Sequence, residues 1–466
     1  MKPASYNQDT IVAIATPPGS GAISIVRLSG QKSLSLCLRH FQTARKGLTI
    51  ENIESNRIYF GTFVDNTKVI DEVLISYFKS PTSYTTEDII EISCHGSEYI
   101  QQKIMEILID EGARTAEPGE FTLRAFLNGR IDLSQAEGVA DLIASQSESL
   151  HKIALNQMRG GISDKISVLR RKLIDFASLI ELELDFSEED VEFANREQFF
   201  KLIAELKEEL SILISSFSMG NVIKQGIPVA IIGKPNVGKS TLLNAILNEE
   251  KAIVSHIPGT TRDAIEDTII LNGYRFRFID TAGLRQSDDV IEKIGIELTY
   301  DKINKATIIL YVCDISNLSN SKVEDVLEEF KTYIQDESKH FILVANKIDM
   351  LCQLPSHIKE ILELDTVFVS AKRKENINLL TDMIIETVKK FNISNDVIVS
   401  NSRHYQALVN ANKAMEQVQA GFDNDVPTDL IAIDIRQALH ELGTITGEIT
   451  TDELLGNIFG KFCIGK

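Results

Sequence analysis

The segment Gly233–Ser240 constrains the fold of this chain more than any other. Its sequence, GKPNVGKS, follows the apolar run PVAII and precedes the helical pattern TLLNAIL. In this strand–loop–helix context the pattern GxxxxGK[ST] forms a phosphate-binding loop, whereas a chance turn before a helix is the weaker alternative. Backbone N–H groups and the positive N-terminus of the following helix bind phosphate oxygens, and the loop lysine, Lys239, reaches the terminal phosphates. The segment therefore predicts a nucleotide-binding α/β domain.

Three later segments support this interpretation and favour GTP over ATP. They are Asp280–Gly283 (DTAG), Asn346–Asp349 (NKID) and Ser370–Lys372 (SAK), each at the end of an expected strand, and together they resemble the motif set of GTPases. The Asp349 carboxylate can accept two N–H groups of guanine, where adenine presents a mismatch. The expected GTP contacts are Asn236, Val237, Gly238, Lys239, Ser240, Thr241, Ser255, Thr260, Thr261, Asp280, Thr281, Ala282, Gly283, Asn346, Lys347, Asp349, Ser370, Ala371 and Lys372.

Hydrolysis at such a site needs a metal ion and an oriented water molecule. Ser240 in the loop and Thr261 in the first-switch segment GTTRD are the candidate Mg²⁺ ligands. The residue after DTAG is Leu284, where Ras-like enzymes place the glutamine that orients the attacking water, and an aliphatic side chain cannot do this. Glu292 is the candidate replacement, although an isolated carboxylate on a polar stretch is more often simply solvated.

Asn236 and the segment Ser255–Thr260 suggest a second, oxygen-rich pocket. In GTPases with this pattern, a potassium ion held by the loop asparagine and by switch carbonyls supplies the positive charge that others take from an arginine finger. The alternative is that Asn236 only stabilises the turn of the loop.

Apolar periodicity divides the remaining chain into regions of different class. Residues 1–120 alternate strand-like runs with helical ones, which predicts a small α/β or α+β domain. Apolar residues recur at steps of four and three over 162–184, so this helical stripe needs a helical partner. Helical patterns also occur at 202–217 and after 400.

Residues 227–387 alternate apolar strands with helices, which is typical of a doubly wound, mostly parallel sheet, and Asn272-Gly273 is a likely hairpin turn within it. We therefore expect a multidomain α/β plus all-α chain. The expected domains are an N-terminal α+β domain at 1–120, a helical domain split into 121–222 and 388–466, and a phosphate-loop domain inserted at 223–387.

Composition excludes several classes of protein. With 466 residues, 43% of them hydrophobic and 25% charged, the chain is long enough for several packed domains. It has no apolar run of membrane-spanning length, and its start lacks the layout of a signal peptide, so we expect a cytoplasmic protein without membrane association. Five scattered cysteines predict neither a disulfide framework nor a zinc site. The net charge of −19 implies that any nucleic-acid contact is local or shared.

Three charged residues interrupt apolar or turn-flanked segments near the N-terminus: Arg27, Glu91 and Arg130. Two arginines and a glutamate can hold a ligand that carries carboxylates and a hydrogen-bonding ring. Salt bridges at strand edges explain the same residues equally well.

The chain ends FCIGK, with Cys463 fourth from the end. A prenylation box is rejected because Gly465 is not aliphatic, Lys466 is an atypical last residue, and no polybasic stretch supports it. Cys463 is better interpreted as a reactive or binding thiol.

Motifs along the whole chain resemble those of one family, in the family's order. They are TPPGSGAISIVRLSG, CHG, AEPGEFTLRAFLNGRIDLSQAE, GKPNVGKS, PGTTRD, DTAGLR, NKID and FCIGK. The chain thus resembles the MnmE (TrmE) family of tRNA-modification GTPases. The GTPase motifs alone are shared with ribosome-assembly GTPases such as Der and Era, whereas the N-terminal segments and FCIGK are more specific.

This resemblance implies an N-terminal folate-binding domain that dimerises, and potassium-stimulated GTP hydrolysis when the G domains of the homodimer meet. It also implies a flavoprotein partner, MnmG, in a heterotetramer that adds an aminomethyl-type group at C5 of the wobble uridine of certain tRNAs. By motif position, 5-formyltetrahydrofolate or a related reduced folate would contact Arg27, Glu91, Arg130 and Lys466. Potassium would contact Asn236, Ser255, Ile257 and Thr260. Glu292 would orient water, and Cys463 would take part in the modification chemistry.

Two other functions stay open from the sequence. One is a GTP-controlled assembly factor that binds ribosomal RNA, and the other is a signalling switch with tight GDP binding. Folate binding separates the modification enzyme from the assembly factor.

Overall fold

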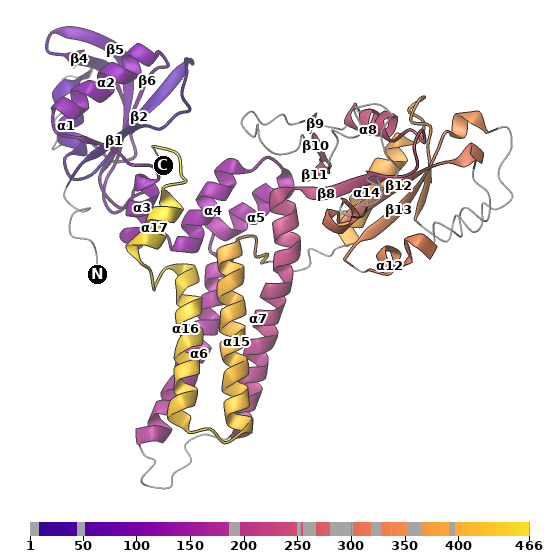
Figure 1. The fold of residues 1–466 in the computed structure, drawn as a ribbon. Coiled ribbons are helices and arrows are strands. Elements are labelled where there is room, and N and C mark those ends of the chain that lie inside the picture. Colours follow the sequence, from indigo (N-terminus) through magenta and orange to yellow (C-terminus); the bar gives the residue numbers. More distant parts are fainter. Residues whose placement is uncertain are drawn as a thin grey trace. The chain divides into compact units, whose positions relative to one another are not determined.

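The computed structural model describes residues 9–43, 52–185, 196–248, 253–254, 267–279, 300, 302–317, 328–336, 338–351, 365–390 and 397–465. The chain forms two compact units (Figure 1). Unit 1 comprises residues 1–140, 157–193 and 424–466, and unit 2 comprises residues 141–156 and 194–423.

Unit 1 contains a mixed sheet with the strand order β3-β4-β5-β6-β2-β1-β7. The strands are β1 (Ile11–Ile14), β2 (Ile23–Ser29), β3 (Phe41–Thr43), β4 (Ile58–Asp65), β5 (Lys68–Phe78), β6 (Ile89–His95) and β7 (Arg114–Thr115). Neighbouring strands are antiparallel except for the parallel pair β1–β7. Helices α1 (Ser33–His40) and α2 (Glu98–Asp110) lie against this sheet (Figure 1) and bury a core with it that includes Val26, Leu36, Ile92 and Ile104. The apolar runs that predicted strands over 1–120 are confirmed.

The helices after this sheet begin with α3 (Glu120–Leu127), α4 (Leu133–Ala144) and α5 (Glu148–Met158). The stripe predicted at 162–184 is the buried face of α6 (Gly161–Asp185), where Ile166, Leu169 and Leu173 are fully buried. Within unit 1 the helix that packs against α6 is α16 (Thr428–Thr446), which lies beside it in Figure 1. Helix α17 (Asp452–Phe459) follows α16 and contacts α3.

In unit 2 the long helix α7 (Arg196–Gln225) packs along α15 (Ser402–Asp423). The rings of Phe217 and Tyr405 stack between them with centroids 4.2 Å apart. The buried positions of α15 include the predicted residues Leu408, Ala411, Met415 and Val418. Both helical patterns predicted at 202–217 and after 400 are therefore present, and their apolar residues contribute to this contact.

The sheet of unit 2 has the strand order β14-β13-β12-β8-β11-β10-β9. Its strands are β8 (Ile227–Ile232), β9 (Ile253–Val254), β10 (Asp267–Leu271), β11 (Tyr274–Phe278), β12 (Ile308–Asp314), β13 (His340–Asn346) and β14 (Thr366–Phe368). Strands β14, β13, β12, β8 and β11 run parallel, and β10 is joined to β11 by the predicted hairpin, so the predicted mostly parallel sheet is confirmed. Strand β9, which pairs antiparallel with β10, was not predicted. Asn272 and Gly273 join β10 to β11 with φ values of 46° and 80°, the positive pair that a type I′ hairpin turn needs.

Helices cover both faces of this sheet. One apolar core joins the sheet to α8 (Lys239–Leu247) and α14 (Ile377–Lys390), and a second contains Ile303 and Phe330, the latter just before α12 (Lys331–Ile334). This is the doubly wound arrangement predicted from residues 227–387. Among the described residues, no helix is both long and apolar enough to cross a bilayer.

A buried ion network joins α3 to the sheet of unit 1. Arg124 is 2% exposed, and its Nη2 donates to Asp9 Oδ1 at 2.7 Å and to Glu120 Oε1 at 2.9 Å. Its Nη1 donates to Glu87 Oε2 at 3.1 Å. Arg114 donates to Asp9 and Glu120 from the other side, at 2.8 and 2.6 Å. Burial raises the pKa of Glu120, but the hydrogen bonds from Arg114 and Arg124 outweigh burial, and this pKa lies below its usual value of 4.5.

We expect Arg124→Met to lower the free energy of unfolding of unit 1 by about 3 kcal/mol near pH 7, because the buried Glu120 then keeps only Arg114 and Glu87 loses its arginine partner. Arg39→Met is the matched control: its pair with Glu111 leaves the arginine side chain 60% exposed, so the loss should be under about 1 kcal/mol. Denaturant unfolding measures both.

The same comparison has a defined pH dependence. Because the pKa of Glu120 is depressed in the folded state, its contribution to stability is present above pH 4.5 and is lost as the pH falls through the folded-state pKa. The difference between Arg124→Met and the unmodified protein should therefore shrink below pH 4.5. A constant difference across that range would contradict the assignment.

Candidate functional site

The phosphate loop connects a buried strand to a helix. Every residue of β8 is buried, the loop begins at Gly233, and α8 begins at Lys239. Gly233 and Gly238 have φ values of 141° and 98°, which strain any residue with a Cβ. A Cβ on Gly238 would lie 2.5 Å from Asn346 Nδ2, and one on Gly233 would collide with the Val312 carbonyl. Both glycines are therefore required for the close packing of the loop.

Asn346 joins the phosphate loop to the two segments expected to contact the base. Its side chain is 2% exposed at the end of β13. The Nδ2 group donates to the Val237 carbonyl at 2.8 Å, and Oδ1 accepts the Ala371 N–H at 3.0 Å. A single buried amide thus connects GKPNVGKS, NKID and SAK, a role that the sequence analysis did not assign to Asn346.

Asp349 and Lys347 take up defined positions beside this amide. Asp349 Oδ1 accepts a hydrogen bond from Ser370 Oγ at 2.7 Å, which holds the pKa of Asp349 below its ordinary value. The carboxylate is therefore ionised at neutral pH and can accept N–H donors. Lys347 Nζ donates to the carbonyl of Asn236 in the phosphate loop and to the carboxylate of Asp314, each at 2.8 Å.

The loop lysine also has partners within the loop. Lys239 Nζ donates to the carbonyls of Gly233 and Lys234 at 2.9 and 2.8 Å. Ser240 and Thr241 follow it in the first turn of α8. Asn236 has a φ of 61°, a left-handed conformation that asparagine adopts more readily than most residues. The described part of the loop therefore has the turn that the sequence predicts.

Several predicted site residues lie outside the described residues. They are Ser255, Ile257, Thr260, Thr261, Asp280, Thr281, Ala282, Gly283, Leu284, Glu292 and Lys466. The complete Mg²⁺ and K⁺ ligand sets and the water-orienting role of Glu292 stay predictions. Among the described residues, no group of three or more His, Cys, Asp or Glu side chains forms a metal cluster.

In unit 1, Arg27 on β2 and Glu91 on β6 are directly opposite in the antiparallel register. Arg27 Nε and Nη2 donate to Glu91 Oε1 at 2.9 and 2.7 Å, so the salt bridge anticipated as one explanation is present. The third nitrogen, Nη1, donates to the Gly465 carbonyl at 3.3 Å, and the guanidinium lies over the Phe121 ring with 5.7 Å to its centroid. The pair is therefore also part of a contact with the chain's last residues.

Arg130 lies over a second aromatic ring. Its guanidinium is 5.4 Å from the centroid of the Tyr84 ring, and it donates to the Ser83 carbonyl. The Tyr84 hydroxyl shares a 3.0 Å hydrogen bond with Thr122. Burial raises the pKa of Tyr84 against the opposing fields of Arg27 and Arg130. Both arginine charges thus act on Tyr84, a residue that the sequence analysis did not single out, as it did not single out Phe121.

The segment after α17 lies over the start of α3. The Gly119 N–H donates to the Cys463 carbonyl at 3.3 Å, and the Phe462 ring packs on that of Phe459 with centroids 5.3 Å apart. Gly465 is buried with a φ of 95°, and a Cβ there would lie 2.5 Å from the Ile14 carbonyl. Residues 462–465 thus lie against the start of α3 and the N-terminal sheet, with the Gly465 carbonyl at Arg27.

Cys463 differs from the other cysteines that the structure describes. Cys463 is exposed, whereas Cys37, Cys94 and Cys313 are buried. Burial raises the pKa of Cys37 and of Cys313 to about 12, and that of Cys94 to about 11. Of these four thiols, only Cys463 is accessible to a reaction partner.

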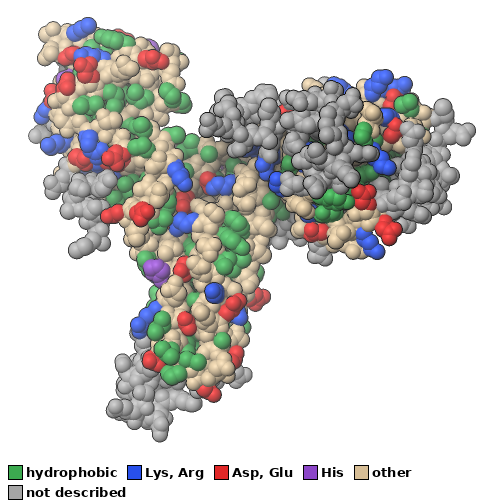
Figure 2. Space-filling model, viewed as in Figure 1, with side chains coloured by type: hydrophobic (Ala, Val, Ile, Leu, Met, Phe, Trp, Pro, Cys, Tyr) green, Lys and Arg blue, Asp and Glu red, His purple; other side chains and the backbone are tan. Residues whose placement is uncertain are grey.

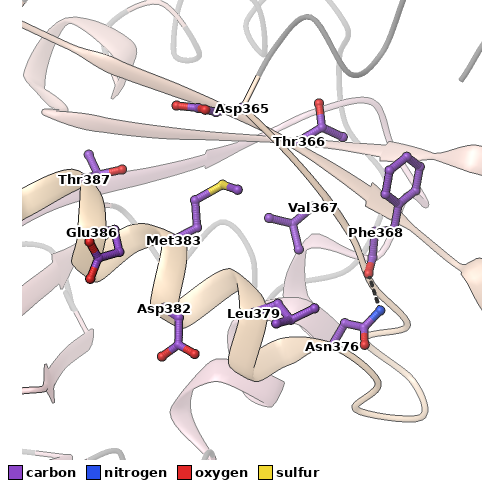
Figure 3. Close-up of a pocket in the computed structure, with 10 residues that line it drawn as sticks. All are labelled: Asp365, Thr366, Val367, Phe368, Asn376, Leu379, Asp382, Met383, Glu386 and Thr387. Carbon is purple, nitrogen blue, oxygen red and sulfur yellow. Dashed lines mark hydrogen bonds between the residues drawn. The ribbon is translucent and has the colours of Figure 1, made fainter. Parts of the chain in front are cut away.

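A separate cavity of about 520 Å³ lies along the edge strand β14 and helix α14 (Figure 3). Apolar side chains such as Val367 and Met383 line it together with Asp365, Asp382 and Glu386. None of the predicted nucleotide or metal ligands is among its lining residues. The predicted GTP site is therefore the phosphate loop and not this cavity.

Two family models match the chain. The model for the GTP-binding protein TrmE N-terminus covers residues 10–130, and the model for the MnmE helical domain covers residues 133–463. The chain belongs to the MnmE (TrmE) family of tRNA modification GTPases. The tRNA modification GTPase MnmE of Flavobacterium johnsoniae is 51% identical over 466 residues, which cover 99% of this chain and 100% of that protein.

Two further comparisons concern relatives at different distances. The tRNA modification GTPase MnmE of Bacteroides thetaiotaomicron is 49% identical, over 99% of this chain and 100% of that protein. Among solved structures, the G domain of the T. maritima FeoB iron transporter is 28% identical, covers 34% of this chain and 97% of that chain, and has a TM-score of 0.25.

The Asp349 carboxylate, which Ser370 holds in position, allows a test of base recognition. Asp349 is predicted to accept two charge-assisted hydrogen bonds from guanine N–H groups, so Asp349→Asn should lower GDP affinity by about 100-fold or more. Xanthine carries a carbonyl where guanine carries its amino group, so the same variant should gain affinity for xanthosine diphosphate. Competition against a fluorescent nucleotide measures both. Equal losses for the two nucleotides would make Asp349 a structural residue.

Proposed function

We propose that this protein is a potassium-stimulated GTP hydrolase that works with a flavoprotein partner, MnmG, on the wobble uridine of certain tRNAs. The product carries an aminomethyl-type group at C5, and a reduced folate such as 5-formyltetrahydrofolate supplies the one-carbon unit. The observation that carries the proposal is the coverage of the chain by the TrmE and MnmE family models around a phosphate loop that Asn346 ties to the base-recognition segments.

The domain assignment follows the order of elements. We assign residues 1–120 to folate binding and dimerisation, 121–222 and 388–466 to a helical domain, and 223–387 to the G domain. Helices α7 and α15 contact each other although the strands β8 to β14 separate them in sequence. This contact supports an α/β domain inserted between two parts of a helical one.

Catalysis of GTP hydrolysis is mainly electrostatic. Lys239 is assigned to the terminal phosphates, and Ser240 with Thr261 to Mg²⁺, which neutralises developing charge when it is bound. Asn236, Ser255, Ile257 and Thr260 are assigned to potassium, and Glu292 to the attacking water. The oxygen-rich donor set fits these two hard cations, and the left-handed Asn236 belongs to the described part of that set.

The folate assignment is supported by the donor set in unit 1. Arg27 and Arg130 can bind the carboxylates of a folate, and Glu91 can accept ring N–H groups. Both guanidinium groups lie over aromatic rings, which favours a flat ligand at the same place. Arg27 also donates to the Gly465 carbonyl, and Lys466, which follows Gly465 in the sequence and lies outside the described residues, is proposed as the fourth contact.

A homodimer is supported by an exposed apolar surface on the sheet of unit 1. Ile58, Phe60 and Leu74 are 68%, 53% and 41% exposed, and Phe60 lies directly opposite Leu74 on neighbouring strands. Side chains of this kind favour burial against a second copy. We assign this face of β4 and β5 to the dimer contact.

The tRNA is assigned a binding surface shared with MnmG. The net charge of the chain is −19, and on the face shown in Figure 2 the Lys and Arg side chains are scattered among Asp and Glu. Binding of a polyanion needs a concentration of positive charge, which the partner is proposed to supply.

The function is tested in cells that lack this protein. Their tRNA should lose the modified wobble nucleoside, as measured by nucleoside analysis with mass spectrometry, and the unmodified gene should restore it. Cys463→Ser should fail to restore the nucleoside while the purified variant still hydrolyses GTP, because Cys463 lies outside every GTPase motif.

Two outcomes of this experiment would contradict the proposal. Normal wobble nucleosides combined with a defect in ribosomal subunits would favour the assembly factor. Restoration by Cys463→Ser would show that Cys463 takes no part in the chemistry. It would not contradict the proposed role of the protein in tRNA modification.

The folate assignment has its own test. Arg27→Ala should weaken calorimetric binding of reduced formyl-folate by about 10-fold or more, because a charge-assisted contact is lost, and should leave GTP turnover unchanged. Arg39→Ala, on α1 of the same domain, is the matched control and should bind normally. Absence of folate binding by the unmodified protein would contradict the assignment.

A further inference from the structure

Three segments meet at Lys347, and one of them has no assigned role. Lys347 Nζ lies 2.8 Å from the Asn236 carbonyl and 2.8 Å from Asp314 Oδ2. Asn236 belongs to the phosphate loop, and Asp314 ends β12. The register of the parallel pair β12–β13 sets Asp314 opposite Asn346, the residue before Lys347. The fold therefore places the Asp314 carboxylate beside the lysine of NKID.

Asp314 is itself held in one orientation. Its Oδ1 accepts the Ser316 N–H at 3.0 Å and the Ser316 hydroxyl at 2.6 Å, which directs Oδ2 to Lys347. Burial raises the pKa of Asp314, but the hydrogen bonds from Lys347 and Ser316 outweigh burial and hold this pKa below its usual value. The carboxylate is therefore a fixed negative charge at neutral pH.

A fixed carboxylate determines where the lysine points. A lysine side chain loses considerable rotamer freedom when it is immobilised, so a single neutral carbonyl holds it weakly. With Asp314 on one side, the ammonium stays at the Asn236 carbonyl. That carbonyl and the next one in the chain, Val237, are then both bound, by Lys347 and by Asn346. Two consecutive peptide groups, the one after Asn236 and the one after Val237, are thus each held by a hydrogen bond.

This restraint acts on a strained residue. Asn236 has a φ of 61°, and a left-handed residue other than glycine persists only where its surroundings hold it. The backbone conformation of Asn236 sets the direction of its Cα–Cβ bond, from which the side chain extends. Asp314 also balances the charge of the Lys347 ammonium, which would otherwise repel a cation near Asn236.

We propose that Asp314 is a positioning residue for the cation site of the phosphate loop: through Lys347 it holds Asn236 in the conformation that presents its side chain to potassium. The inference rests on the proposed potassium-stimulated GTPase. It predicts that loss of the Asp314 charge weakens potassium binding more than it weakens nucleotide binding or the maximal rate.

The experiment measures two responses to potassium concentration at constant ionic strength and saturating Mg²⁺: GTP turnover, and the rise in melting temperature of the protein bound to a non-hydrolysable GTP analogue. For Asp314→Asn, the potassium concentration for the half-maximal response should rise at least about 5-fold in both. Turnover at saturating potassium should stay within about 2-fold of the unmodified protein, because the phosphates and the water are bound by other groups.

The chain offers a matched control. Asp336 Oδ1 accepts the Ser338 N–H at 2.9 Å and the Ser338 hydroxyl at 2.6 Å, the same local turn as at Asp314. The described hydrogen bonds of Asp336 are to Ser338, whereas Asp314 also accepts one from Lys347. Asp336→Asn removes the same charge at the same kind of turn and should leave the potassium dependence unchanged. Asp314→Glu, which keeps the charge, should recover part of the potassium affinity.

The outcomes separate this inference from the function it rests on. Equal turnover of the unmodified protein in sodium and in potassium would overturn the potassium-stimulated GTPase, and the inference with it. Potassium stimulation that Asp314→Asn leaves at the same half-maximal concentration would overturn only the inference. So would a folded Asp314→Asn that loses turnover equally at every potassium concentration, or a folded Asp314→Glu as impaired as Asp314→Asn.

Discussion

The buried amide of Asn346 is the interaction on which the candidate nucleotide site depends. One side chain, 2% exposed, donates to the phosphate loop at Val237 and accepts from the SAK segment at Ala371. These contacts connect strands β8, β13 and β14, whose carboxyl ends lie at one edge of the sheet, where open α/β folds bind their ligands. A buried amide that loses either partner carries the full cost of an unsatisfied polar group. The loop that holds phosphate and the loops that hold the base therefore keep one relative geometry.

Local signals were sufficient for most of the secondary structure. The apolar runs in 227–387 became a mostly parallel sheet, and Asn272-Gly273 formed its hairpin because a type I′ turn requires two residues with positive φ. The stripe at 162–184 became the buried face of α6, but periodicity alone does not identify the partner of a stripe. That partner is α16, whose first residue lies more than 240 residues after the end of α6.

Side-chain networks between distant segments could not be predicted in the same way. Arg27 and Glu91 were open to two explanations, and the structure shows that the salt bridge and the contact with the chain's end involve different nitrogens of one guanidinium. Tyr84 and Asp314 belong to none of the quoted motifs, and Phe121 lies within AEPGEFTLRAFLNGRIDLSQAE without an assigned role, since the importance of all three arises from neighbours that the fold supplies. Arg124 lies within the same motif, yet two of its three carboxylate partners, Asp9 and Glu87, come from other segments. Motif spacing identifies functional residues that are close in sequence, whereas these contacts join residues that only the fold brings together.

The two compact units differ in how they are assembled from the chain. Most of unit 2 is continuous, from residue 194 to 423, whereas unit 1 combines residues 1–140 with residues 424–466. Gly465 is buried against Ile14, and its carbonyl lies on Arg27. During synthesis, the sheet of unit 1 emerges from the ribosome long before residues 462–465, which contact it and the start of α3. A nascent chain stalled before residue 460 therefore still exposes the Arg27 and α3 surfaces that these residues contact in the finished fold.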